Sequence, residues 1–259
     1  MGLGQSVKQS VSFVVPCYNE RGNIARTIEE IETAAQEAAI PDYEILVVDD
    51  ASSDGTGALV TALAEQKRHV KLITNARNLG FGGAYKEGVK RASGTYVIMV
   101  PGDNAHPRDG ITPILRKAGE ADIVIPYVAN PEARSWQRRL ASRGFTFLIN
   151  TLSGLDVPYF NGPVLHKTEL LQQIEIKTNS FAYQAEALVK LITGGATYCG
   201  VPVTVTERST GASSAFALKN VYRVAAAIFL LWREGYHPSF NAAQTFRPPA
   251  GTHLSEELD

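Results

Sequence analysis

The sequence has little cysteine, almost no imbalance of charge and no long apolar run. Its two cysteines, Cys17 and Cys199, lie far apart in apolar surroundings. We therefore expect two buried free thiols, as in a reducing cytoplasm, rather than a disulfide. The formal net charge is −1 over 259 residues. Nucleic-acid-binding proteins carry a basic excess or a basic stripe, so this balance argues against that class.

Segments long enough to cross a membrane are missing as well. The longest uninterrupted apolar run is the nine-residue stretch Val224–Trp232, whereas a membrane-spanning helix needs about 20 apolar residues. Met1–Ser10 contains no apolar core of the kind that a signal peptide requires. We therefore expect a cytoplasmic protein without a spanning segment. Peripheral contact with the inner face of a membrane is compatible with this expectation.

What the first half of the chain does have is a regular alternation of short apolar runs and helical patterns. The apolar runs are rich in β-branched residues and bounded by turn formers, as buried parallel strands are. Such alternation predicts an α/β fold with a mostly parallel central sheet flanked by helices. The predicted strands are Val11–Pro16, Tyr43–Asp49, Val70–Thr74, Tyr96–Val100 and Asp122–Pro126. The predicted helices between them are Asn23–Ala38, Gly55–Gln66, Gly82–Arg91 and Pro107–Ala118.

The second half of the chain has a different character. Ala129–Leu155 is an amphipathic helical stretch in which Arg134, Arg138, Arg139 and Arg143 stand beside aromatic and aliphatic residues. The further predicted elements are a helix at Tyr183–Ile192, a strand at Val201–Thr206 and a last helix at Phe216–Glu234.

Polar residues follow the predicted strands where each one ends. Pro16 ends the first strand, with Tyr18 and Glu20 directly after it, and Asp49 and Asp50 end the second. Because ligands bind at the carboxyl ends of strands in an open parallel sheet, we expect a site at this edge. Tyr18 suits stacking on a nucleobase, and the carboxylates of Glu20 and Asp50 suit the donors of a base or ribose. Capping of the next helix explains Glu20 equally well.

The fourth predicted strand runs into the segment Pro101–Pro107. Its Asp103 is a candidate ligand for a divalent cation, with Asn104 or His106 and water completing the shell. The alternative is a turn capped by Asp103, which the preceding Pro-Gly pair favours. Gly80–Gly83 lacks the Lys-Ser/Thr ending of a P-loop, so we interpret it as a place where a helix packs closely near the ligand.

Taken together, these motifs resemble those of family 2 glycosyltransferases, in the branch of dolichol- and polyprenol-phosphate mannosyl- and glucosyltransferases. The similarity extends from about residue 10 to about residue 215 and is most specific in the first half of the chain. The segments that carry it are Pro16–Glu20, Val48–Thr56, Asn78–Ala84, Ser142–Gly144, Gln184–Glu186, Val201–Val203 and Arg208–Ser214.

The resemblance implies a GT-A fold in one continuous domain, with a nucleotide-sugar-binding half at 1–127 and an acceptor-side half at 128–237. Residues 238–259, which include Pro248-Pro249 and Glu256-Glu257, are predicted to form a flexible tail. The resemblance also implies inverting transfer of a hexose from a UDP- or GDP-sugar to a polyprenyl phosphate at the cytoplasmic membrane face, with Mg²⁺ or Mn²⁺ bound by Asp103. The residues implied to bind the nucleotide sugar are Pro16, Tyr18, Glu20, Val48, Asp50, Gly102, Asp103 and Arg208, the last at the diphosphate. Those implied to bind the acceptor phosphate are Arg138 and Ser142.

The chain departs from the family pattern at three positions. Pro101 stands where the first acid of the usual D-x-D motif is expected, and Val128 stands where an arginine usually follows the fifth strand. Ser214 stands where a second basic group is expected. These departures leave fewer charged side chains to bind phosphates. Because the acid expected at Pro101 is missing, a non-catalytic protein that binds nucleotide sugars is an alternative interpretation.

The acceptor decides whether the reaction needs a general base. A sugar hydroxyl, as in polysaccharide or glycolipid synthesis, needs one, and Glu186 is the candidate; the alternative is an acid that stabilises the start of its helix. A lipid phosphate is already an anion and needs cations, which the arginines of Ala129–Leu155 supply unless they form a solvated face. The helix at Phe216–Glu234 fits docking on a membrane surface and fits equally a helix that covers the domain.

Overall fold

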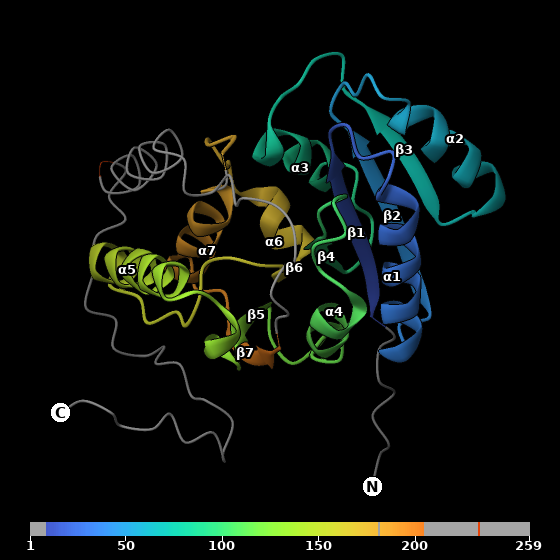
Figure 1. The fold of residues 1–259 in the computed structure, drawn as a ribbon. Helices are drawn as coiled ribbons and strands as arrows, with labels where there is room; N and C mark the ends of the chain where they lie inside the picture. Colours follow the sequence, from blue (N-terminus) through green and yellow to red (C-terminus); the bar gives the residue numbers. More distant parts are fainter. Residues whose placement is uncertain (1–8, 181, 205–232, 234–259) are drawn as a thin grey trace, which may run out of the picture.

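The computed structural model describes residues 9–180, 182–204 and 233. Within these residues, seven strands form one sheet in the order β3-β2-β1-β4-β6-β5-β7, flanked by helices (Figure 1). The strands are β1 Ser10–Cys17, β2 Asp42–Asp49, β3 Val70–Thr74, β4 Tyr96–Met99, β5 Ile123–Val128, β6 Leu165–Lys167 and β7 Tyr198–Val203. The helices are α1 Ile24–Glu37, α2 Thr56–Gln66, α3 Phe81–Val89, α4 Arg108–Leu115, α5 Trp136–Ser153, α6 Thr168–Gln173 and α7 Tyr183–Thr193, with a 3₁₀ turn, η1, at Pro131–Ala133.

The predicted α/β fold with a mostly parallel sheet is confirmed. β1 pairs in parallel with β2 and β4, β2 with β3, and β5 with β7. The short strand β6 lies antiparallel between β4 and β5 and was not predicted, nor was α6. β7 begins at Tyr198 rather than at the predicted Val201, because its pairing with β5 starts there.

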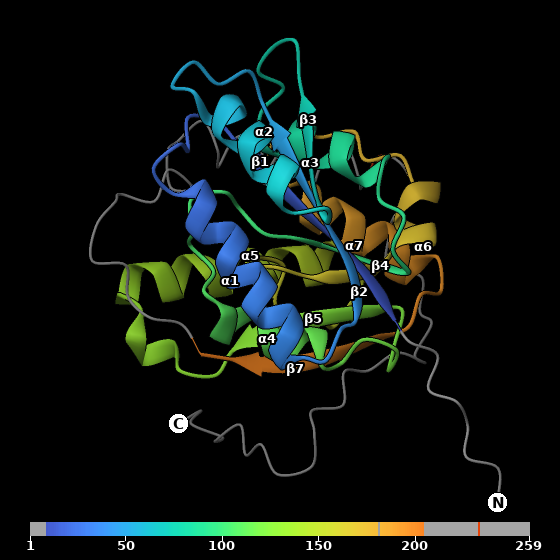
Figure 2. The same cartoon turned by 90° about the vertical axis from the view of Figure 1, so that its right-hand side faces the viewer.

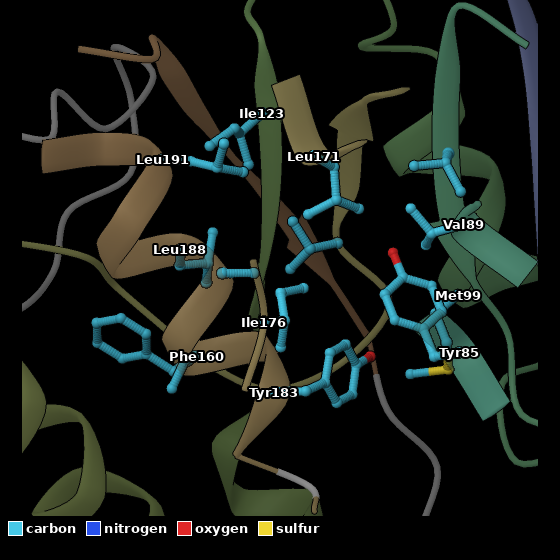
Figure 3. Close-up of a cluster of buried hydrophobic side chains, with 14 of the residues drawn as sticks. Tyr85, Val89, Met99, Ile123, Phe160, Leu171, Ile176, Tyr183, Leu188 and Leu191 are labelled. Carbon is cyan, nitrogen blue, oxygen red and sulfur yellow. The ribbon is translucent and has the colours of Figure 1, made fainter. Parts of the chain in front are cut away.

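Helices cover both faces of the sheet, and each face has its own hydrophobic core (Figures 1 and 2). Successive side chains of a strand point to opposite faces, so Phe13 and Val15 of β1 meet α1, α2 and α4, while Val14 meets the side of α3, α5, α6 and α7. Figure 3 shows the second of these cores. There, Tyr85 of α3 and Tyr183 of α7 lie side by side, with ring centroids 4.8 Å apart.

The order of the strands creates a crevice at one edge of the sheet. From β1 the chain builds β2 and β3 on one side and then returns to place β4 on the other side. Ligands bind at such switch points, outside the carboxyl ends of the strands. The backbone is tied together there, since the N–H of Asp50 donates to the carbonyl of Cys17 (2.9 Å) and that of Gly102 donates to the carbonyl of Pro16 (3.0 Å).

Several expectations concern other parts of the chain. Both cysteines are free; Cys17 is buried as predicted, whereas Cys199 is only partly buried. Among the described helices, none has the length and apolarity that a membrane span requires. Apart from residue 233, the predicted helix at Phe216–Glu234 lies outside the described residues, as does the tail at 238–259.

At the other end of the sheet, the buried carboxylate of Glu44 in β2 joins three further segments. Its Oε1 accepts from the hydroxyl of Ser12 (2.7 Å) and from the backbone and hydroxyl of Ser93 (2.8 Å each), and its Oε2 pairs with Lys71 (2.7 Å). Burial alone raises the pKa of Glu44, but the hydrogen bonds from Lys71, Ser12 and Ser93 outweigh it and lower the pKa to about 2.

Acid is therefore expected to weaken the fold through Glu44. Its pKa in the folded protein lies below the ordinary value of 4.5, so its stabilisation is complete above that pH and is lost as the pH falls toward 2. The difference is on the order of 3 kcal/mol. Calorimetry of Glu44→Gln should show a lower Tm at neutral pH and a shallower fall of Tm through this acidic range. The same slope in both proteins would contradict this assignment.

Candidate functional site

A cavity of about 740 Å³ opens at the carboxyl ends of β1, β2 and β4. The residues that line it come from two sets of segments: the first wall, formed by the segments after these strands and the start of α3, and the second wall, formed by the end of β5, Ala133, Arg134, Arg138 and the loop 159–163. Met99 and Tyr183, at the edge of the core in Figure 3, form part of its inner surface. The volume is typical of small-molecule and cofactor sites, which occupy about 300–1,000 Å³.

The cavity brings together most of the predicted site residues. Val48 does not line it, because its side chain is fully buried in the core on the α3 side of the sheet. Ser142 and Glu186 do not line it either, and Arg208 lies outside the described residues. The predicted residues that line the cavity are Pro16, Tyr18, Glu20, Asp50, Gly102, Asp103 and Arg138.

The loop after β1 is fixed to the loop after β2. The N–H of Asn19 donates to the hydroxyl of Ser52 (2.9 Å), and the N–H of Glu20 donates to the hydroxyl of Thr56 (3.0 Å). Asp49 holds the second loop by accepting from the N–H of Ser52 (3.0 Å). These bonds set the position of the side chains that the first loop presents to the cavity.

Tyr18 and Glu20 occupy the rim of the cavity. The side chain of Tyr18 is 51% exposed, which leaves its ring accessible to a planar ligand. α1 has no side-chain cap, and the carbonyl of Glu20 rather than its carboxylate accepts from the N–H groups of Asn23 and Ile24. The carboxylate of Glu20 bonds the side-chain amide of Asn23 (2.8 Å). Helix capping therefore does not explain the Glu20 side chain.

Asp50 is buried at the back of the same rim. Its carboxylate accepts from the side chain of Asn75 (2.8 Å) and from the N–H groups of Leu79 and Gly80 (2.9 Å each). A carboxylate has about four acceptor positions, so Asp50 holds the loop before α3 and keeps acceptor capacity at the cavity surface.

The glycines at the start of α3 permit a close approach of two segments. The N–H of Gly82 donates to the carbonyl of Asn179 (3.0 Å), and a Cβ at Gly82 would lie 2.8 Å from the carbonyl oxygen of Ser180. Gly80 has φ +78°, in the left-handed region that favours glycine. The interpretation of Gly80–Gly83 as a place of close packing is confirmed.

The turn that is the alternative interpretation of Asp103 is present, and Asp103 also lies at the cavity. Its Oδ1 accepts from the N–H of Ala105 (3.0 Å), so it stabilises a turn, and its side chain also lines the cavity. Asn104 has φ 54°, and its buried Oδ1 has no hydrogen-bond partner among the described residues. Gly102 lets the turn pack against β1, since a Cβ there would lie 2.8 Å from the Cβ of Cys17.

The donors at this turn fit one mode of metal binding. Within the described part of the chain, no group of three or more His, Cys, Asp or Glu side chains is placed to hold a metal ion. Mg²⁺ in phosphate-transfer sites uses one or two carboxylates and completes its shell with water and substrate phosphates. Asp103 and His106 both line the cavity, whereas Asn104 does not. The residues present therefore fit a cation that a bound diphosphate completes.

Cys17 lines the cavity but is not a nucleophile. Burial, followed by the charges of Asp49 and Glu20, raises the pKa of Cys17 to about 12. Its thiol donates to the carbonyl of Val48 (3.4 Å). Because the thiolate is the reactive form, Cys17 stays inert at neutral pH.

Two arginines, Arg134 and Arg138, belong to the second wall. In α5, Arg138 shares one helix face with Phe145 and Ile149, which pack against the core on the α3 side. Ser142 lies on this face too, at helical spacing between them, and is partly buried. The outer face carries apolar side chains that are largely exposed: Trp136 (64%), Leu140 (63%) and Phe147 (73%).

Glu186 lies behind the cavity, buried in α7. Its carboxylate accepts from the N–H groups of Lys177 (2.8 Å) and Thr178 (3.0 Å) and pairs with Lys190 (2.8 Å). Its oxygens are engaged and it does not line the cavity. This geometry does not support the prediction that Glu186 is a general base; it holds the loop before α7.

Among the side chains that line the cavity, sequence reasoning gave no site role to Tyr159, Asn161 and Gln184. Gln184 connects α7 to the loop 159–163, because its amide donates to the carbonyl of Gly162 (3.1 Å) while its oxygen accepts from the hydroxyl of Tyr183 (3.0 Å). The Asn-Gly-Pro run at 161–163 was a visible turn signal, but nothing local indicated which elements that turn faces.

Residues 12–175 match the family model described as glycosyl transferase family 2. The chain belongs to this family. The predicted resemblance is thereby confirmed, and the seven-stranded sheet with its helices is the GT-A fold of glycosyltransferases.

Individual family relatives and solved structures agree with this assignment. The chain is 30% identical over 187 residues to an undecaprenyl-phosphate 4-deoxy-4-formamido-L-arabinose transferase of Enterobacter sp. (strain 638); the match covers 68% of this chain and 57% of the relative. Mannosyl-3-phosphoglycerate synthase from Rubrobacter xylanophilus has a similar structure, with TM-score 0.64 and 18% identity over 91% of this chain and 78% of that one. A mannosyltransferase from Pyrobaculum calidifontis, in complex with GDP-Man and Mn²⁺, gives TM-score 0.55 and 18% identity over 93% and 77%.

Proposed function

We propose that this family 2 chain transfers a hexose from a UDP- or GDP-sugar to a polyprenyl phosphate, with inversion at the anomeric carbon. The observation that carries the proposal is that one cavity combines two sets of side chains. Carboxylates and an exposed tyrosine lie at the strand ends, and two arginines come from the segment around the start of α5. The first wall suits a nucleotide, and the second suits an anionic acceptor. The name of the Enterobacter relative supports this acceptor class, and the GDP-Man complex of the Pyrobaculum enzyme supports the donor class.

Each residue of the first wall has a proposed part in donor binding. Tyr18 stacks on the base, and Glu20 and Asp50 accept from base or ribose hydroxyls. Asp103 and His106 would hold Mg²⁺ or Mn²⁺, which would neutralise charge on the leaving diphosphate. Arg208, proposed to bind the diphosphate as well, lies outside the described residues.

The chemistry is a direct displacement. A phosphate oxygen of the acceptor forms a bond to the anomeric carbon as the bond from that carbon to the nucleoside diphosphate breaks, which inverts the configuration. The acceptor is already an anion, so no general base is required, and Arg138 positions its charge. A hydroxyl acceptor would need a base, and the engaged carboxylate of Glu186 gives that alternative no support.

We extend the proposal to peripheral membrane contact, because α5 has an exposed apolar face. Trp136, Leu140 and Phe147 follow helical spacing with Arg143 on the same face. Apolar and aromatic side chains beside a cation suit the interface of an anionic bilayer. Arg138 on the neighbouring face would then meet a phosphate held at the membrane surface.

The test is a transfer assay with labelled UDP- or GDP-hexose, Mn²⁺, and polyprenyl phosphate in anionic vesicles. We expect a polyprenyl-phosphate hexose with inverted linkage, loss of product in EDTA, and co-flotation of the chain with the vesicles. Transfer to a sugar hydroxyl but not to polyprenyl phosphate would overturn the acceptor assignment. Thermal shift with UDP and GDP tests the donor alone, since a ligand at about 100 Kd adds roughly 2.7 kcal/mol of stability.

A further inference from the structure

The strongest unassigned feature of the cavity is an arginine held in place by a neutral partner. Arg134 follows η1, and its Nη1 donates to the hydroxyl of Tyr159 (3.0 Å). Its Cζ lies 5.7 Å from the centroid of the same ring. Both side chains line the cavity. The pair joins the segment before α5 to the loop 159–163, so the guanidinium has a defined position at the cavity wall.

Because the partner of Arg134 is the neutral side chain of Tyr159, the positive charge of Arg134 stays available to a ligand. A carboxylate partner would neutralise a guanidinium, whereas a tyrosine hydroxyl and ring fix it without doing so. Among the described residues, no ion pair includes Arg134, and the acids that line the cavity, Glu20, Asp50 and Asp103, come from the first wall. The end of β5 contributes Pro126 and Val128 to the second wall. Within the described part of the chain, the charged side chains of the second wall are Arg134 and Arg138.

We propose that Arg134, positioned by Tyr159, binds a phosphoryl group in the cavity and selects for a phosphorylated ligand. A guanidinium uses one of its five N–H donors on Tyr159 and can present others to phosphate oxygens, often two at once. The ligand is either the phosphate of the acceptor or the diphosphate of the donor. The inference rests on the proposed function for the identity of these ligands, but not for the anion binding itself.

The test measures binding of four probes: UDP, inorganic pyrophosphate, farnesyl phosphate and farnesol. Arg134→Gln keeps a donor for Tyr159 and removes the charge. We expect at least about tenfold weaker binding of either farnesyl phosphate or UDP, because hydrogen bonds between charged groups are among the strong ones. Loss for farnesyl phosphate alone identifies the acceptor phosphate, and loss for UDP and pyrophosphate identifies the donor diphosphate. Binding of farnesol should not change.

Two further variants separate phosphate binding from a structural tether. Tyr159→Phe keeps the ring and removes the hydroxyl, so it should weaken the same probe by about threefold to tenfold. Arg68→Gln, an exposed arginine away from the cavity, is the matched control and should change nothing. A lower Tm for Arg134→Gln with unchanged affinity for every phosphorylated probe would overturn the inference. If farnesyl phosphate does not bind the wild type while the pyrophosphate result holds, only the proposed acceptor is overturned.

Discussion

The Asp103→Asn variant is expected to fold like the wild type and to transfer sugar at least about a hundredfold more slowly. Asparagine keeps an oxygen for the N–H of Ala105 (3.0 Å in the wild type), so the turn persists, but the negative charge at the cavity is lost. Removing one electrostatic contact to a developing charge typically costs about 10²–10³ in kcat. The measurement is kcat at saturating donor over a series of Mn²⁺ concentrations.

Asp109→Asn is the matched control for this experiment. It also removes one acid, close to Asp103 in the chain, but its side chain is 79% exposed on α4 and does not line the cavity. Its kcat should stay within about twofold of the wild-type value, because isolated surface charges contribute little. If Asp103→Asn has the kcat and the metal dependence of the wild type, Asp103 is not part of the proposed metal site and only stabilises the turn.

Glu186→Gln is expected to lower the free energy of unfolding by about 3–5 kcal/mol, since it removes the carboxylate that lies 2.8 Å from the buried ammonium of Lys190. The pair is nearly inaccessible, with side-chain exposures of 6% for Lys190 and 5% for Glu186. Lys190 also donates to the carbonyl of Glu175 (2.8 Å). Chemical denaturation measures the loss, which corresponds to a fall in Tm on the order of 10 °C.

Two controls identify the cause. The double variant Glu186→Gln/Lys190→Met removes both charges and should recover much of the stability, because no unpaired buried charge remains. Glu87→Gln removes an acid paired with the exposed Lys90 and Arg91 and should cost at most about 1 kcal/mol. If Glu186→Gln has unchanged stability but no transfer activity, the structural assignment is contradicted and Glu186 acts as the general base.

The fold could be predicted where the sequence pattern was local. The β-branched runs of β1 to β5 and the helical patterns between them are strong signals. β6 was missed because it has only three residues, Leu165–Lys167, and includes the buried His166. Its place between β4 and β5 depends on pairing with strands more than 40 residues distant along the chain.

The residues of the site could also be predicted only where the signal was local. Tyr18, Glu20, Asp50 and Asp103 could be located at one cavity because parallel strands bring their carboxyl ends to a common edge. The environment of Glu186 could not be predicted, since an acid in the first turn of a helix looks the same whether it faces a cavity or a buried lysine. The contact of Arg134 with Tyr159 joins residues 25 positions apart and leaves no periodic signal.

The position of β6 has a consequence for how such chains diversify. β6 fills the space between β4 and β5, although both of these strands come much earlier in the chain. A fragment ending at residue 127 would lack β6 and β7, so one edge of β4 would be unpaired and β5 would have no partner strand. Exchange of the later part of the chain between relatives therefore has to preserve the pairing at the centre of the sheet. Under the proposed function, new acceptor preferences are more accessible through substitutions at the cavity, in residues 133–138 and 159–163, than through such an exchange.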